Sequence, residues 1–312
     1  MSDLAHDDQA SPAVDAAQVE RSAAAAWPAG RSEAVAGWLL RQTPGVRRQR
    51  SNSALPPAPE LHPERTLDAV EAFYRAAGLP ALVQVSPAER HAALDAALAA
   101  RGYRRAAPTL VLAGSAAEII TGTASATPWA AAEIITGTAS ATPRAAAEVI
   151  AETAAGAPWP AAGVLGGSAA VTPGSAGVVI DAAAGGAWLA AYQAFNGPVD
   201  TSPVAEVVLA RVPSPAGFAR IEVDGRAVAI GLFVATGEWA GVFCMATDRA
   251  YRRRGLALAV LGAGARWAAA HGCAGLYLQV ERGNDAARYL YARAGFTHSH
   301  SYHYRVADFH GS

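Results

Sequence analysis

The segment from Thr247 to Leu261, TDRAYRRRGLALAVL, contains the residues of this chain that are best suited to bind a charged ligand. A strand-like apolar run ends here, and three arginines lie just before a helix-like run. The first turn of a helix exposes backbone N–H groups and the positive end of the helix dipole, and glycine lets an anion approach closely. The segment therefore predicts a phosphate site made by Arg252, Arg253, Arg254, Gly255, Leu256, Ala257 and Leu258. Taken alone, a solvated arginine run before an ordinary helix is the competing interpretation.

A second segment, LQVERGNDAARYLYARAGF from Leu278 to Phe296, has the pattern of a strand followed by a helix. Asn284 stands at the expected start of the helix, where its short side chain can cap the first turn. Tyr291 follows seven residues later; a lone helical tyrosine there would be expected in the core. Gly295 is a stop signal for the helix.

In this order and context, the two segments resemble the GCN5-related N-acetyltransferase (GNAT) superfamily. The first family motif, Q/R-x-x-G-x-G/A, is matched from Arg252 to Ala257, and the second, N-x-x-A-x-x-L-Y-x-x-x-G-F, from Asn284 to Phe296. The resemblance covers about residues 176–306. It implies an acetyl-CoA-dependent N-acetyltransferase, in which a primary amine attacks the thioester directly within a ternary complex. No metal is expected.

The resemblance also implies individual roles. Met245, Ala246 and Thr247 are expected beside the pantetheine and the acetyl group, where a main-chain N–H can donate to the thioester oxygen. Asn284 is expected to contact the coenzyme, and Tyr291 to contact it and to protonate the departing thiolate.

The general base is the point at which the chain departs from the pattern. Gln279 stands where some family members carry a glutamate, and an amide cannot accept a proton at neutral pH. We expect Glu281 to serve instead, with a water chain, Glu238 or a C-terminal histidine as alternatives. The departure also favours a rival function, a non-catalytic acyl-CoA-binding regulatory module. Three nearby histidines occupy alternating strand faces, so a metal site is not expected from His298, His300 and His303.

Composition excludes several other classes. The 312 residues carry a net charge of −1, so there is no electrostatic case for nucleic acid or an anionic membrane as partner. No run of 18 apolar residues lacks a charge, glycine or proline, which argues against a membrane span. The only cysteines, Cys244 and Cys273, are too few for a disulfide framework. We expect a cytoplasmic protein with buried, unreactive thiols.

Four segments are expected along the chain. Residues 1–26 read as a disordered tail, and residues 27–113 as a degenerate acetyltransferase-like half that lacks the arginine motif. Residues 114–176 read as an insertion, because AAEIITGTASATPWA from Ala116 recurs almost unchanged from Ala131 and, decayed, from Ala146. Residues 177–312 form the catalytic domain.

Both ordered segments end alike, with a helix, a short strand, a second helix, a glycine–aromatic pair and a last strand. Gly102-Tyr103 and Gly295-Phe296 are these pairs. We therefore predict two similar α/β halves, each a mixed, mostly antiparallel sheet flanked by helices. A strand is expected over 46–55, and a hairpin turning at Asp224-Gly225.

Overall fold

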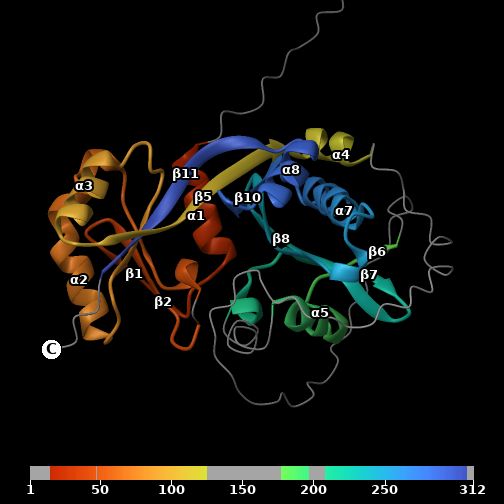
Figure 1. Cartoon of the computed structure of the whole chain (residues 1–312), viewed down its shortest axis with the longest axis horizontal. Coiled ribbons are helices and arrows are strands. Elements are labelled where there is room, and N and C mark those ends of the chain that lie inside the picture. The colour runs from red at the N-terminus through yellow and green to blue at the C-terminus, as the bar shows by residue number, and fades with distance from the viewer. Residues whose placement is uncertain (1–14, 47, 125–176, 197–207, 308–312) are drawn as a thin grey trace, which may run out of the picture.

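A computed structural model describes residues 15–46, 48–124, 177–196 and 208–307, which build one eleven-stranded mixed sheet with helices on both faces (Figure 1). The strands are β1 (Arg31–Val35), β2 (Trp38–Gln42), β3 (Ala54–Leu55), β4 (Leu82–Val85), β5 (Arg104–Ser115), β6 (Val178–Asp181), β7 (Ala216–Val223), β8 (Arg226–Thr236), β9 (Trp239–Thr247), β10 (Gly275–Glu281) and β11 (Thr297–Val306). The α-helices are α1 (Ala16–Ala26), α2 (Leu67–Ala76), α3 (Ala92–Ala100), α4 (Ala116–Ala124), α5 (Gly186–Asn196), α7 (Leu256–Ala270) and α8 (Asp285–Arg293).

The two predicted halves are confirmed by the order of the elements. The run β1-β2-β3-α2-β4-α3-β5 is repeated as β7-β8-β9-α7-β10-α8-β11. In each half the first strands pair antiparallel, and the pair that flanks the first helix, β3 with β4 or β9 with β10, is parallel. The fold is therefore a tandem of two mixed, mostly antiparallel units.

Local sequence explains the boundaries that repeat between the halves. Gly102 and Gly295 adopt φ values of 82° and 99°, which glycine adopts without steric cost. After each glycine the aromatic residue donates its backbone N–H five residues back into the helix, Tyr103 to Leu98 and Phe296 to Tyr291, at 3.0 Å in both cases. The same C-terminal capping pattern, a left-handed glycine followed by an aromatic residue, thus ends α3 and α8.

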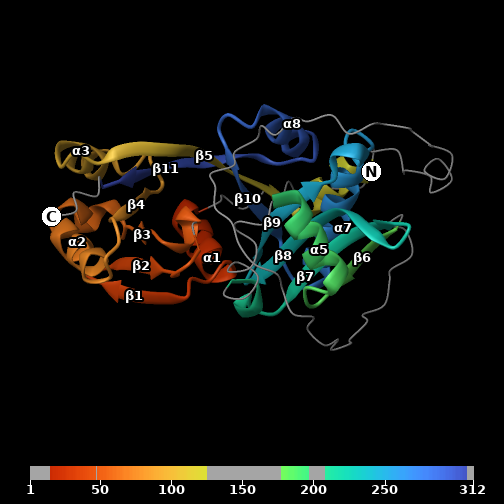
Figure 2. The same ribbon diagram turned by 60° about the horizontal axis from the view of Figure 1, so that its bottom comes forward.

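The halves exchange their last strands. The sheet order is β1-β2-β3-β4-β11-β5-β10-β9-β8-β7-β6, so β11 pairs with β4 of the N-terminal half, and β5 pairs with β10 of the C-terminal half. β5 and β11 also pair with each other, from Arg104 with Val306 to Ala113 with Thr297. Figure 2 shows these two long strands running from one half into the other. Each half is therefore completed by a strand of its partner half.

Each face of the C-terminal half is covered by different helices, as Figure 1 shows. α7, α8 and α4 cover one face, with Ile119, Val260 and Leu261 fully buried beneath them. α5 and α1 cover the other, which we call the α1 face, and there Trp188 is fully buried and Trp27 stacks on Phe243. Strand β9 therefore presents side chains to two separate apolar layers.

The structure corrects three of these predictions: the tail, the insertion and the strand over 46–55. The expected disordered tail over 1–26 contains α1, whose Val19 and Ala26 are fully buried and whose Asp15 caps the first turn. The part of that tail before residue 15 lies outside the described residues. The alanines that suggested disorder are small enough to pack the helix closely against β8 and β9.

The insertion expected over 114–176 begins later than its repeats suggested. Gly114 and Ser115 end β5, and residues 116–124 of the first repeat copy form α4. Ser115 and Glu118 form a capping box, with reciprocal bonds of 3.1 and 3.2 Å between side chain and backbone N–H. Ile119 is fully buried. The remaining repeat residues lie outside the described part of the chain.

The strand expected over 46–55 is also wrong. A 3-10 turn, η1 (Gln49–Ser51), is followed by the two-residue strand β3. Asn52 satisfies the backbone of this turn instead of a neighbouring strand, donating to the carbonyls of Val46 at 2.6 Å and Arg48 at 3.2 Å. Within the described residues, no helix is long and apolar enough to span a bilayer.

Candidate active site

The candidate site lies where the parallel strands β9 and β10 stop pairing. Their ladder runs from Trp239 opposite Gly275 to Val242 opposite Leu278. Beyond that point β9 pairs only with β8, and β10 only with β5. The facing backbone edges of residues 243–247 and 279–281 are consequently not joined by a ladder, and a ligand with amide groups can hydrogen-bond to such edges.

A bulge in β9 sits at this opening. The register between β8 and β9 shifts between Ile230 and Leu232, and Cys244 opposite the shift has φ 52°. Phe243 and Cys244 therefore both pack on the α1 face, whereas Met245 packs on the α7 side and Ala246 returns to the α1 face. The bulge thus re-aims the backbone of the three residues expected beside the acetyl group, Met245, Ala246 and Thr247.

The arginine loop follows β9 and leads into α7. Asp248 caps the short turn η7 (Arg249–Tyr251) by accepting the N–H of Ala250 at 2.9 Å. Arg253 and Gly255 both have left-handed backbones, at φ 65° and 77°, and Gly255 is the N-cap of α7 without any side-chain cap. The first turn of α7 therefore keeps its backbone N–H groups available for a ligand.

The surroundings of this helix opening fit an anionic group. A Cβ placed on Gly255 would meet no atom within 4 Å, so the space above the helix end is open. Arg252, Arg253 and Arg254 are exposed; Arg252 donates to the Thr247 carbonyl at 3.2 Å, and Arg254 lies over the Tyr251 ring at 5.3 Å. Among the described residues no carboxylate forms an ion pair with these three arginines. Leu256 and Leu258 are buried, so they contribute backbone rather than side chain.

Asn284 has the position of the N-cap that its sequence predicts. Its side-chain oxygen accepts the N–H of Ala287 at 3.1 Å. Its backbone N–H donates to the Glu281 carbonyl at 3.0 Å, which fixes the turn between β10 and α8. The side chains of Asn284 and Glu281 are exposed at the same end of β10, so they lie at the rim of the opening.

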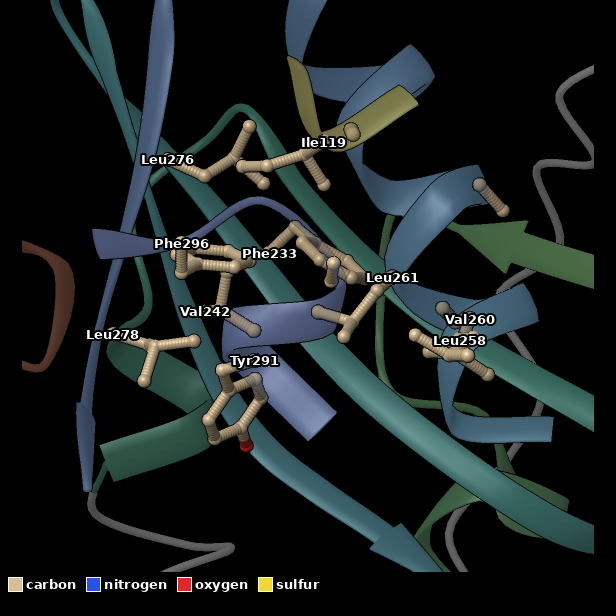
Figure 3. Close-up of a cluster of buried hydrophobic side chains, with 14 of the residues drawn as sticks. Ile119, Phe233, Val242, Leu258, Val260, Leu261, Leu276, Leu278, Tyr291 and Phe296 are labelled. Atoms are coloured by element: carbon tan, nitrogen blue, oxygen red, sulfur yellow. The ribbon is translucent and has the colours of Figure 1, made fainter. Parts of the chain in front are cut away.

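Tyr291 is 9% exposed and belongs to the apolar cluster under α7 and α8. Its ring meets Phe296 edge to face, with centroids 5.9 Å apart. Figure 3 shows its hydroxyl pointing away from Phe296, Phe233 and Leu261, at the margin of that cluster. Burial raises the pKa of Tyr291 to about 12, so the hydroxyl keeps its proton at neutral pH and can act as a donor.

The residues considered as bases are placed differently. Gln279 accepts a hydrogen bond from the Tyr302 hydroxyl at 3.3 Å and faces α1, like Tyr277 two residues earlier. By strand alternation Glu281 points to the same face. Glu238 lies in the turn before β9, a whole strand away from Thr247, at roughly 3.3 Å per residue. That distance removes Glu238 from the candidate bases.

The C-terminal histidines form separate contacts because β11 crosses into the other half. His298 contacts Ser301 at 3.0 Å, His300 contacts Glu20 at 2.9 Å, and His303 contacts Asp95 at 2.6 Å. In the described residues no three metal-ligand side chains gather together.

Cys244 lies beside the bulge but is a poor nucleophile. Burial raises its pKa to about 12, although the guanidinium groups of Arg48 and Arg50 act in the opposite direction. Burial also raises the pKa of Cys273. At neutral pH both thiols therefore stay protonated, which disfavours a cysteine-linked acyl intermediate.

Sequence reasoning missed the contribution of the N-terminal half to this site. Trp27, at the end of α1, stacks on Phe243 with centroids 5.5 Å apart, and Arg50 lies over the same ring at 5.5 Å. Both precede the matched motifs by about 200 residues, and no spacing rule connects residues that meet only through sheet packing.

Comparisons with known proteins identify similar families and relatives. Residues 187–296 match the acetyltransferase (GNAT) family, and residues 14–126 match the family described as "Probable histone acetyltransferase Rv0428c C-terminal". The chain is 38% identical over 91 residues to the "Uncharacterized N-acetyltransferase YobR" of Bacillus subtilis (strain 168), a match that spans 29% of this chain and 36% of that protein.

One solved structure is similar over nearly the whole chain. It is a GCN5-related N-acetyltransferase from Kribbella flavida, with a TM-score of 0.57, 17% identity, and coverage of 95% of this chain and 96% of that one. At this identity the likeness concerns the fold. It extends through both halves.

Proposed function

Because residues 187–296 match the acetyltransferase (GNAT) family, we propose that the protein is an acetyl-CoA-dependent N-acetyltransferase acting on a primary amine. One observation carries the proposal: the β9–β10 ladder ends at a bulge next to an uncapped helix opening with three exposed arginines. An acyl carrier with a pyrophosphate at one end and amide groups along its arm matches that arrangement.

The donor is bound in two places. Arg252, Arg253 and Arg254 and the first-turn N–H groups of α7 hold the pyrophosphate, with Gly255 giving room for its approach. The open edge of β9 at residues 245–247 holds the pantetheine amides, and Asn284 lines the coenzyme from the start of α8. Several charge-assisted hydrogen bonds, at about 1.5–3 kcal/mol each, suffice for micromolar binding.

The reaction is a direct transfer within a ternary complex. The neutral amine attacks the thioester carbonyl, the new C–N bond forms, and the C–S bond breaks. A backbone N–H of the bulged strand stabilises the carbonyl oxygen as it gains negative charge. Glu281 accepts the proton lost by the amine, directly or through water, and Tyr291 gives its proton to the departing thiolate.

The alternative is an acyl-CoA-binding regulatory module without turnover, which the amide at Gln279 favours. Activity and binding separate the two. Purified full-length protein is titrated with acetyl-CoA by calorimetry, and thioester cleavage is followed with a thiol reagent across a panel of amines. Binding with amine-dependent cleavage is expected. Binding without cleavage by any amine would establish the regulatory module.

A further inference from the structure

The N-terminal half places a cation against the reacting strand. The guanidinium carbon of Arg50 lies 5.5 Å from the centre of the Phe243 ring, and Phe243 directly precedes the bulge at Cys244. Trp27 stacks on the same ring. Arg50 also acts electrostatically on the Cys244 thiol. The positive charge of Arg50 therefore acts on Cys244, just beyond the point where β9 stops pairing with β10.

The backbone that carries Arg50 is held in place by a network of hydrogen bonds within residues 43–52 and to Trp27. Trp27 donates its indole N–H to Ser51 Oγ at 3.1 Å, and Thr43 Oγ1 donates to the Ser51 carbonyl at 2.9 Å. The backbone N–H of Thr43 donates to Asn52 Oδ1 at 2.7 Å. Such a loop is pre-organised, so a ligand that contacts Arg50 does not have to order it.

The nearby carboxylate is already committed to other groups. Glu20 is buried, and its oxygens accept from Gln84 at 2.9 Å and Ser86 at 2.6 Å and also contact His300 at 2.9 Å. The Gln84 amide in turn accepts from Arg41 at 2.7 Å. Gln84 thus links Glu20 to Arg41, and within the described residues no ion pair joins Glu20 to Arg50.

Arg50 itself has a different environment. Its side chain is half-buried. Within the described residues, its guanidinium makes a cation–π contact with the Phe243 ring and no ion pair with a carboxylate. Its guanidinium carries five N–H donors, which suit planar recognition of a carboxylate or a phosphate. Ala246 and Gln279 on the same face are also partly exposed, so solvent reaches this side of the opening.

We propose that Arg50 binds an anionic group, carboxylate or phosphate, on the amine acceptor, so that the acceptor approaches the thioester from the α1 face. α7 and its arginine loop occupy the other side, and an acceptor bound by the Arg50 guanidinium has its amine next to the bulge. The inference rests on the proposed function. It makes the N-terminal half a determinant of specificity rather than a relic.

The test uses matched amines in the presence of saturating coenzyme A, the product thiol, so that binding is measured without turnover. The pairs are L-amino acids against their carboxamides, and phosphoethanolamine against ethanolamine. Calorimetry is expected to show binding of the anionic member at least 10-fold tighter in at least one pair. In Arg50→Gln the anionic member is expected to bind at least about 10-fold more weakly, so that the preference disappears, and in Arg50→Lys the loss is expected to be smaller.

Arg31→Gln is the matched control, because Arg31 also lies over an aromatic ring, Phe73 at 5.6 Å, but belongs to β1 at the far edge of the sheet. Arg31→Gln is expected to leave the preference for the anionic amine unchanged. Coenzyme A affinity and the unfolding temperature show whether each variant is folded. Equal binding of both members, tighter binding of neutral amines or of a lysine peptide, or a preference that survives in Arg50→Gln would overturn the proposal. The assay is independent of turnover, so a failed proposed function appears separately, as absent thioester cleavage.

Discussion

Arg305 on β11 forms a two-bond ion pair with Asp95 on α3, at 2.7 Å from Nε to Oδ1 and 2.9 Å from Nη2 to Oδ2. The two residues are 210 positions apart and belong to different halves. His303 adds a third contact to the same carboxylate at 2.6 Å. The exchanged strand is therefore fastened to the N-terminal half by a charged cluster as well as by its ladder.

This cluster predicts an acid-sensitive step in unfolding. Hydrogen bonds from Arg305, followed by those from His303, lower the pKa of Asp95 to about 2, although partial burial opposes this. The pKa of the same group in an unfolded chain is about 3.9. A lowered folded-state pKa adds stability that is present above pH 4 and is lost as the pH falls toward 2.

Asp95→Asn is expected to unfold at lower temperature at neutral pH and to lose this part of its pH dependence between pH 4 and 2. Thermal unfolding across that range checks it. Asp68→Asn is a control, because Asp68 pairs with Arg101 within one half and is 86% exposed. Parallel curves for wild type and Asp95→Asn would contradict the expectation.

A second prediction concerns the loop before α7. Gly255→Val introduces a side chain at φ 77°, in the open space where the pyrophosphate is proposed to approach. We expect acetyl-CoA to raise the melting temperature of wild type by mass action and to have little effect on this variant. Gly272→Val gives comparable backbone strain at φ 80° at the other end of α7 and should retain the shift. A full shift in Gly255→Val would remove the loop from the binding site.

A third prediction assigns the acid. Tyr291→Phe keeps the ring against Phe296, so acetyl-CoA affinity should change little. Turnover is expected to fall about 10²- to 10⁴-fold, the usual contribution of a positioned acid. Tyr289→Phe on the same helix, with its side chain 66% exposed, should behave as wild type. Comparable turnover in Tyr291→Phe at saturating substrates would show that another group protonates the thiolate.

A fourth prediction concerns the base. Glu281→Gln is expected to lower turnover by a similar factor and to shift the rising limb of the pH–rate profile to higher pH, because hydroxide or the free amine must then supply the neutral nucleophile. Glu238→Gln, at the opposite end of β9, should leave the profile unchanged. If both variants keep the wild-type profile, water alone carries the proton.

A fifth prediction comes from the repeats. Deleting residues 116–130 should preserve stability, because the next copy carries the same AAEIITGTASATP and can supply an identical α4. Deleting 116–160 removes the fully buried Ile119. The free energy of unfolding should fall by at least about 2–5 kcal/mol, the range typical of one large core truncation. Urea unfolding of the two deletions provides the comparison. Equal stability would show that α4 does not support the C-terminal half.

Much of the C-terminal half was predictable from the sequence because its signals are local. The turn Asp224-Gly225 has φ 51° and 74°, as a two-residue hairpin requires. Asn284 caps α8, and Gly255 opens α7, because capping and left-handed backbone depend on residues within one turn. For these reasons the strand–loop–helix order of both motifs could be read directly.

The tertiary structure alone decided which residues of distant segments meet. The α1 segment lacks a clear apolar period in the sequence, and its burial depends on β8 and β9 about 200 residues later. The exchange of β5 and β11 has no sequence signature, because an antiparallel strand with the same pattern satisfies either neighbour. That exchange brings Tyr302 to Gln279 and β11 to Asp95. Local patterns thus set the geometry of single turns and caps, whereas the pairing of strands across the whole sheet determined how the two halves join.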